Sequence, residues 1–334
     1  MKTSLFLAAA VAASGIVFAA EPAAGPVVAG KPRVKVVATT FPIYDWTREV
    51  LGEKLAETDL VLLQQSGVDL HSYSPSAADL RMIAACDLFV FVGGESDEWT
   101  ERALAQKGKP RRRVLNLVNT LGSAAKEEKV VEGMEHEHHH DHAKEHDHGE
   151  EHDHDEHEID EHVWLSLRHA ATLVKAIAAE LSAIDPANAA TYRANAGAYC
   201  GRLAALDRDY AAAVKSAKRK TILVADRFPF RYLADDYGLT YYAAFSGCSA
   251  ESEASFKTVA FLAKKVDELG LPAILVIEGV KHKIAETVRR TTKSKDQRIL
   301  TLDSLQSTGG EAAKTTRYLD VMTRNLETLK AALN

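Results

Sequence analysis

Histidines alternating with acidic residues are the feature of this sequence best suited to chemistry. Ten of the 14 histidines lie between His136 and His157, interleaved with Glu and Asp and with almost no apolar residues. Neutral imidazole is a preferred ligand of Zn, Cu and Ni ions, and the carboxylates raise the local cation concentration. Such a segment cannot bury enough apolar surface to offset its ordering entropy. We expect a disordered loop that binds several metal ions weakly; the alternative is an acidic loop that only aids solubility.

One stretch of this tract, His136 to His140, matches the HExxH signature of zinc proteases. That chemistry requires a helix with an apolar back face, which holds two histidines rigidly on one metal ion. The flanking residues here are Glu, Asp and His, so the match follows from composition. We therefore expect no protease activity from it.

Two histidines outside the tract stand at junctions between predicted elements. His71 lies in the segment 67–76, just ahead of a predicted helix, and His162 lies where the acidic loop ends and the next helix begins. Connections between strands and helices are where an α/β sheet presents ligand-binding groups. A single histidine is more often a core or surface residue. Two at such junctions, one of them adjoining the tract, predict a defined metal site.

The rest of the chain alternates predicted strands and helices, a pattern typical of parallel sheets with helices on both faces. Strands are predicted at 34–40, 59–63, 88–92 and 114–118, and again at 221–225, 239–243, 273–277 and 298–302. Between the two sets, Asp185-Pro186 opens a long Ala-rich helix that reaches about Lys218. The sequence therefore predicts an α/β fold of two (β/α) lobes with parallel sheets, joined by a long rigid helix.

The N-terminus has the pattern of a secretory signal. Lys2 precedes a short apolar run, and small residues at Ala19-Ala20 form a cleavage site ahead of Glu21. The first cysteine is Cys86, so a lipid-anchored start is not expected, and no later stretch is long and apolar enough to span a membrane. We predict a soluble, exported protein of the periplasm, with residues 1–20 removed.

A chain of 334 residues corresponds to about two domains. The predicted organisation is a signal peptide at 1–20, an N-terminal lobe at 31–184 with a disordered loop at about 125–160, a connecting helix at 185–218 and a C-terminal lobe at 219–334. Three scattered cysteines exclude a disulfide scaffold and a CxxC site, although one pair could form a bridge in an oxidising compartment.

Charge is segregated in this chain. Residues 135–161 hold 13 acids and one lysine, a local charge of −12, so the net charge of −6 leaves +6 for the remainder. The protein outside the tract is therefore not acidic. It also lacks the basic stripe that would indicate a nucleic-acid partner.

The segments 67–76 (GVDLHSYSPS) and 160–165 (DEHVWL) resemble the two metal-ligand motifs of the zinc- and manganese-binding proteins that serve ABC importers. The acidic histidine loop ahead of the second motif is typical of the zinc-uptake branch, and the resemblance covers essentially the whole mature chain. It implies two lobes with one ion in the cleft between them and His71 and His162 as ligands from the first lobe. It also implies a monomer whose partner is a membrane permease.

The resemblance implies further ligands from the second lobe. The family places a His or Glu just after the first strand of that lobe, where this chain has Arg227, and a cation cannot ligate a metal. Asp226 is therefore the predicted substitute, and Asp303 falls where the family has its aspartate ligand. Other acidic residues that could face the cleft are Glu278 and, near Cys248, Glu251 and Glu253.

Two imidazoles with one or two carboxylates suit Zn²⁺ at ~2.0–2.2 Å and would also hold Mn²⁺. The histidine tract favours zinc. We predict a periplasmic solute-binding protein that captures Zn²⁺, with Mn²⁺ as the second candidate, and delivers it to an ABC importer. One alternative is an exported metal buffer that uses only the tract. Another is a metal-dependent hydrolase, which would need a general base beside an open coordination position.

Overall fold

The computed structural model describes residues 33–65, 67–135, 158–249, 253–279 and 282–334. Residues 33–334 form one compact unit. The predicted signal peptide and the ten histidines of the tract lie outside the described residues.

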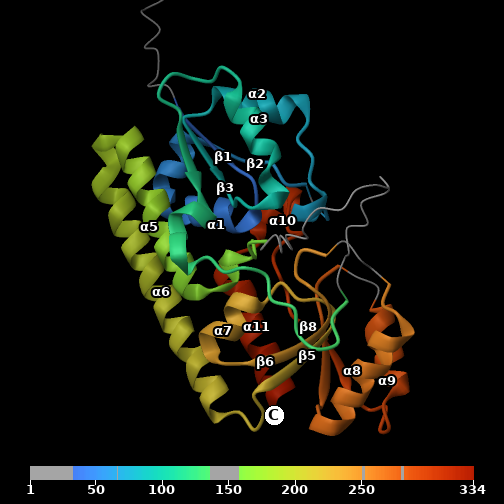
Figure 1. The fold of residues 1–334 in the computed structure, drawn as a ribbon. Coiled ribbons are helices and arrows are strands. Elements are labelled where there is room, and N and C mark those ends of the chain that lie inside the picture. The colour runs from blue at the N-terminus through green and yellow to red at the C-terminus, as the bar shows by residue number, and fades with distance from the viewer. Residues whose placement is uncertain (1–32, 66, 136–157, 250–252, 280–281) are drawn as a thin grey trace, which may run out of the picture. The chain divides into compact units, whose positions relative to one another are not determined.

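Two parallel sheets organise this unit (Figure 1). The first has the order β2-β1-β3-β4 and the second has the order β6-β5-β7-β8, and every pairing is parallel. The strands of the first sheet are β1 Val34–Ala38, β2 Thr58–Leu62, β3 Leu88–Phe91 and β4 Arg113–Asn116. Those of the second sheet are β5 Thr221–Arg227, β6 Thr240–Phe245, β7 Ala273–Val276 and β8 Arg298–Thr301.

Helices cover the two sheets. Along the first lobe they are α1 Phe41–Leu51, α2 Ala77–Ala85, α3 Trp99–Ala105, α4 Leu117–Leu121 and α5 Leu167–Ile184. The second lobe has α7 Arg231–Tyr237, α8 Phe256–Leu269, α9 Lys283–Thr291 and α11 Tyr318–Leu333. The short helix α10, Gly310–Thr315, lies beside α1 of the first lobe (Figure 1), where the guanidinium of Arg48 donates to the carbonyls of Ala313 and Lys314. The strands β3 (LFVF) and β7 (AILV) are buried along their whole length, as expected for central strands of a sheet that is covered on both faces.

The long helix α6, Ala189–Ser216, runs along both sheets (Figure 1). Its 28 residues correspond to ~42 Å at ~1.5 Å per residue. It packs against α1 and α5 in the first lobe and against α11 in the second lobe. Asn195 donates to the carbonyl of Val50 in α1, and Tyr210 donates to the carbonyl of Met322 in α11. The predicted fold class, two (β/α) lobes joined by a long helix, is confirmed.

A single apolar core continues from one sheet to the other. Residues of β1, β3, β5 and β7 belong to the same buried cluster as the inner faces of α5, α6 and α11. Buried polar contacts add to it: the indole of Trp164 donates to the carbonyl of Ser304, and the hydroxyl of Tyr318 donates to the carbonyl of Trp164. Because Trp164 follows His162 by two residues, these contacts also fix the position of His162.

The described ends of the predicted loop at about 125–160 are ordered. The amide of Glu128 donates to the carbonyl of Glu158 at 2.7 Å, and the amide of Asp160 donates to the carbonyl of Lys126 at 2.8 Å. Farther along, the amide of Glu135 donates to the carbonyl of Ala244 in β6. Residues 126–128 therefore pair with residues 158–160, and Glu135 reaches β6 of the second sheet, so the ordered structure reaches further into this segment than predicted. Among the helices described, none combines the length and apolarity needed to span a bilayer.

Candidate metal centre

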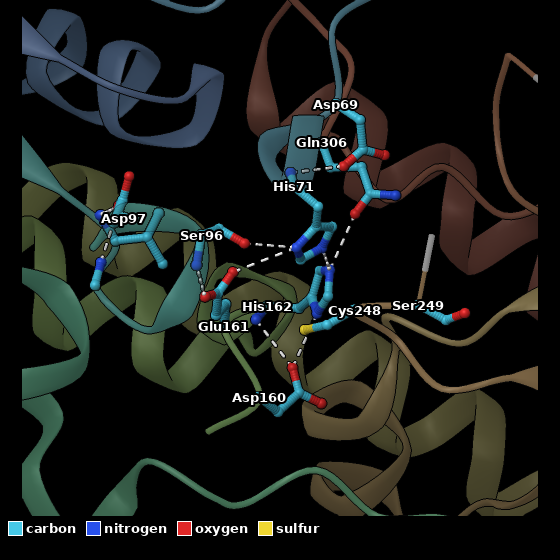
Figure 2. Close-up of polar contacts among 12 residues, drawn as sticks. Asp69, His71, Ser96, Asp97, Asp160, Glu161, His162, Cys248, Ser249 and Gln306 are labelled. Carbon is cyan, nitrogen blue, oxygen red and sulfur yellow. Dashed lines mark hydrogen bonds and ion pairs between the residues drawn. The ribbon is translucent and has the colours of Figure 1, made fainter. Parts of the chain in front are cut away.

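Side chains that follow the carboxyl ends of strands in both sheets meet at one place (Figure 2). His71 follows β2 and Ser96 follows β3, while Cys248 follows β6 and Gln306 follows β8. His162 stands just ahead of the short helix η5, Val163–Leu165, at the start of α5. Parallel sheets present their ligand-binding groups at this end of the strands.

His71 is held by contacts on its backbone and on one ring nitrogen. Its amide donates to Oδ1 of Asp69 at 3.0 Å, which caps the turn Leu70–Ser72. Its Nδ1 lies 2.7 Å from Oγ of Ser96 and 3.5 Å from Oε2 of Glu161. The carboxylate of Glu161 also accepts from the amide of Ser96. These contacts leave Nε2 of His71 pointing toward His162.

His162 is fully buried and is oriented by a carboxylate. Oδ1 of Asp160 lies 2.9 Å from the amide and 2.9 Å from Nδ1 of His162. Its Nε2 lies 3.0 Å from Oε1 of Gln306, which comes from the second lobe. A carboxylate on the far nitrogen of an imidazole is the usual arrangement behind a histidine ligand, because it fixes the tautomer and the ring orientation.

The two imidazoles face each other at a spacing that suits one metal ion. Their Nε2 atoms are 3.3 Å apart. Two nitrogens bound at ~2.0–2.1 Å to a tetrahedral zinc ion are themselves ~3.3–3.4 Å apart. In the described part of the chain, Cys248 joins this group: one donor atom each from His71, His162 and Cys248 lies within 4.8 Å of the others.

The pKa values of the two histidines are shifted in opposite directions. Burial and the positive charge of His162 lower the pKa of His71 to about 3. Burial also acts to lower the pKa of His162, but the carboxylates of Asp160 and Glu161 outweigh it, and that pKa is raised. Below the pKa of His162, the metal-free pair therefore holds one proton, on that ring. A cation that binds between the rings must displace that proton.

The acidic residues predicted as ligands from the second lobe lie outside this group in the described structure. Asp226 accepts from the amide of Arg227, and Asp303 accepts from the amide of Leu305. Glu278 accepts from the amide and hydroxyl of Ser304. Glu253 is exposed, and Glu251 is not among the described residues. Ligation by Asp226 and Asp303 stays a prediction.

Arg227, at the position where the resemblance placed a ligand, makes an ion pair instead. Its guanidinium lies 2.7 Å from Oδ2 of Asp69, the residue that caps the turn of His71. It also donates to the carbonyl of Ser249, next to Cys248. Arg227 therefore joins the loop of His71 to the loop of Cys248.

Cys248 is the member of the group that the sequence did not predict. A cysteine without a nearby partner has no ligand spacing to recognise. The sequence did offer one indication, which is the position of Cys248. It lies three residues after Phe245, the last residue of β6, in a connection where such sheets present ligands. Only the folded chain brings this residue close to His162.

Replacing Asp160 by Asn should lower zinc affinity by about 10- to 100-fold, because His162 loses the charge that orients its ring and raises its basicity. Competition against a zinc chelator measures this. Asp209→Asn, an exposed change of the same charge on α6, is the control and should leave affinity unchanged. Equal affinities in both variants would argue against a role for Asp160 behind the ligand.

The known proteins that this chain resembles are zinc-binding and zinc-uptake proteins. Residues 36–332 match the family described as zinc-uptake complex component A, periplasmic. The chain is 31% identical over 303 residues to the zinc-binding protein AdcA of Streptococcus pyogenes serotype M3, covering 89% of this chain and 56% of that protein. It is 32% identical over 301 residues to the high-affinity zinc uptake system protein ZnuA of Bacillus subtilis, covering 90% of this chain and 88% of that protein.

Among solved structures, the Zn(II)-bound ZnuA-like domain of Streptococcus pneumoniae AdcA is similar, with a TM-score of 0.68 and 27% identity over 90% of this chain and 99% of that one. The chain spans about half the length of the first curated relatives it matches. The match to the family extends through both sheets and includes both motif histidines, so the chain belongs to the zinc-uptake complex component A family.

Proposed function

We propose that this protein captures Zn²⁺ between its two lobes in the periplasm and delivers it to the permease of an ABC importer. The observation that carries the proposal is the pair of Nε2 atoms 3.3 Å apart, each on a ring whose other nitrogen is already held. The names of the relatives, zinc-binding and zinc-uptake proteins, support zinc as the cargo.

The surroundings of the two imidazoles favour transport over catalysis. His162 is fully buried and the side chain of His71 is 10% exposed. Asp160 contacts Nδ1 of His162, and Glu161 contacts Nδ1 of His71 and accepts from the amide of Ser96. They are therefore engaged in positioning, whereas a hydrolase needs a free general base beside an open coordination position. We propose a binding protein with no enzymatic step, acting as a monomer.

The second lobe should complete the coordination sphere. Asp226 and Asp303 are the carboxylates proposed from the sequence, and each is tested by substitution with Asn. A tenfold or greater loss of zinc affinity in either variant would support that residue as a ligand. An unchanged affinity would remove it from the site.

We propose that residues 1–20 are removed on export near Ala19/Ala20, which would place the mature chain in the periplasm. Relatives from Streptococcus pneumoniae are named zinc-binding lipoproteins. Here we propose release without a lipid, on the sequence argument that the first cysteine is Cys86. The intact mass of the exported protein tests both points, since cleavage and a bound lipid each change it.

Zinc uptake by cells that lack the protein tests the proposed function. Restoring the natural chain should restore accumulation of radioactive zinc at low zinc concentration, and a His71→Ala/His162→Ala chain should not. If the double variant restores uptake fully, the two imidazoles do not carry the transported ion. If neither chain affects uptake, the protein does not serve an importer.

Deleting residues 136–157 separates the tract from this site. The deletion keeps Glu135 and Glu158, whose backbones are hydrogen-bonded to the rest of the chain, and replaces the segment by a short Gly/Ser linker. We expect the weak zinc sites to disappear and one tight site to remain, as measured by titration calorimetry. Loss of the tight site would mean that the tract itself binds the ion, which favours a metal buffer.

A further inference from the structure

We infer that Cys248 supplies the third protein ligand of the zinc site as a thiolate, and that its sulfur makes the site select zinc over manganese. The inference rests on the proposed function, because it concerns the same site. It departs from the ligands that the sequence resemblance implied, which were carboxylates from the second lobe.

Contacts of its own loop fix the position of Cys248. Its amide donates to Oε1 of Glu128 at 2.8 Å, so the loop is fixed to the ordered segment that precedes the tract. A side chain at Gly247 would lie 3.0 Å from the carbonyl oxygen of Phe228 and 3.2 Å from Cε1 of His162. The loop can approach the imidazole this closely because residue 247 has no side chain. Figure 2 shows the sulfur of Cys248 beside the rings of His71 and His162.

Arg227 explains why a ligand should come from this loop. The residue at that position cannot bind a cation, and its guanidinium is committed to Asp69 and to the carbonyl of Ser249. Both contacts lie next to proposed ligands: Asp69 caps the turn of His71, and Ser249 adjoins Cys248. Arg227 therefore acts as a positioning residue that holds the two ligand loops together across the lobes.

The distances suit a mixed nitrogen and sulfur site. Zinc binds thiolate sulfur at ~2.3 Å and imidazole nitrogen at ~2.0–2.1 Å, which places sulfur and nitrogen ~3.6 Å apart in a tetrahedron. One donor atom from each of the three residues lies within 4.8 Å of the others. Small side-chain rotations would therefore bring all three donors onto one ion.

The thiol of Cys248 loses its proton to solvent as the Zn–S bond forms, so the ion gains one anionic ligand and one proton is released. No oxidant or reductant is needed. Thiolate is a soft ligand that suits zinc, whereas Mn²⁺ is better held by carboxylate and carbonyl oxygen. Sulfur in the site should therefore raise the preference for zinc over manganese.

The other two cysteines provide a control. All three are free thiols in the structure. Cys200 lies on α6, where its sulfur donates to the carbonyl of Ala171, away from the metal group. Cys200→Ser therefore makes, outside the site, the same thiol-to-hydroxyl change that Cys248→Ser makes within it.

The test uses the mature protein under reducing conditions, with Co²⁺ as a spectroscopic probe and with Zn²⁺ and Mn²⁺ titrations. The natural chain and Cys200→Ser should show the near-ultraviolet thiolate-to-cobalt charge-transfer band, and Cys248→Ser should lack it. Zinc affinity should fall by roughly 100-fold or more in Cys248→Ser, since the binding free energy of the ion is shared among about four ligands. Manganese affinity should change far less.

The outcomes separate this inference from the proposed function. A natural chain that binds zinc tightly through His71 and His162 but shows no charge-transfer band would overturn the inference and leave the function standing. A chain with no tight zinc site would overturn the function. Because the band is measured on the natural chain, the result does not depend on whether the variant folds; circular dichroism checks the fold of each variant.

Discussion

Replacing both His71 and His162 by alanine should abolish the tight zinc site. Structural zinc sites bind with an apparent ~10–16 kcal/mol, shared among about four ligands, so losing two imidazoles should lower affinity by roughly 10⁴-fold or more. Titration calorimetry on the mature protein measures this directly. The weak sites of the histidine tract should remain, because that segment is unchanged in the variant.

His169→Ala is the matched control for this experiment. His169 is a half-buried imidazole on α5 whose ring packs against Tyr232, with ring centroids 5.1 Å apart, outside the metal group. Its loss should leave the tight site intact. If the double variant instead binds zinc as tightly as the natural chain, the ion lies elsewhere and the metal-buffer interpretation is supported.

Zinc affinity should fall steeply as the pH is lowered from 7.5 to 5. The pKa of His162 is raised above the ordinary histidine value of ~6.5 by Asp160 and Glu161, so below that pKa zinc must displace a proton. Each pH unit below it lowers affinity by ~10-fold, a loss of at least roughly 30-fold by pH 5. The pKa of His71, about 3, keeps that ring neutral throughout this range, so it adds no pH dependence.

The thiol of Cys248 should steepen this response. Burial and the charge of Glu128 raise the pKa of the thiol, so it is protonated across the whole range. A thiolate ligand therefore adds a further ~10-fold per pH unit. Chelator competition at several pH values, on the variant lacking residues 136–157, isolates the tight site from the tract. An affinity that stays flat from pH 7.5 to 5 would contradict imidazole ligation.

Most of the fold could be predicted from the sequence because its signals are local. Continuous apolar runs such as those of β3 and β7 identify buried parallel strands, and Asp185-Pro186 marks the start of the long helical segment. The meeting of His71 and His162 could be predicted because each lies in a short motif at a junction between elements.

The second-lobe side of the site could not be predicted in the same way. Cys248 meets His162 only through contacts between residues far apart in sequence, and a lone cysteine has no spacing that indicates a metal. Asp226 and Asp303 are at strand ends, as a ligand would be. Carboxylates at strand ends also cap backbone amides, which is what these two do in the described structure.

The shared core bears on how the site can work. One face of each sheet belongs to the same buried cluster, and Trp164 and Tyr318 join their loops through buried hydrogen bonds. Large separation of the lobes would break this core. We therefore expect zinc to enter and leave through movements of the loops that carry His71 and Cys248, on sheets that stay largely fixed.

A crystal structure of the zinc-loaded mature protein, with anomalous diffraction at the zinc edge, tests the central claim most directly. We predict one strong peak at ~2.0–2.1 Å from Nε2 of both His71 and His162, with Sγ of Cys248 at ~2.3 Å. A strong zinc peak that neither imidazole contacts would contradict the proposed site.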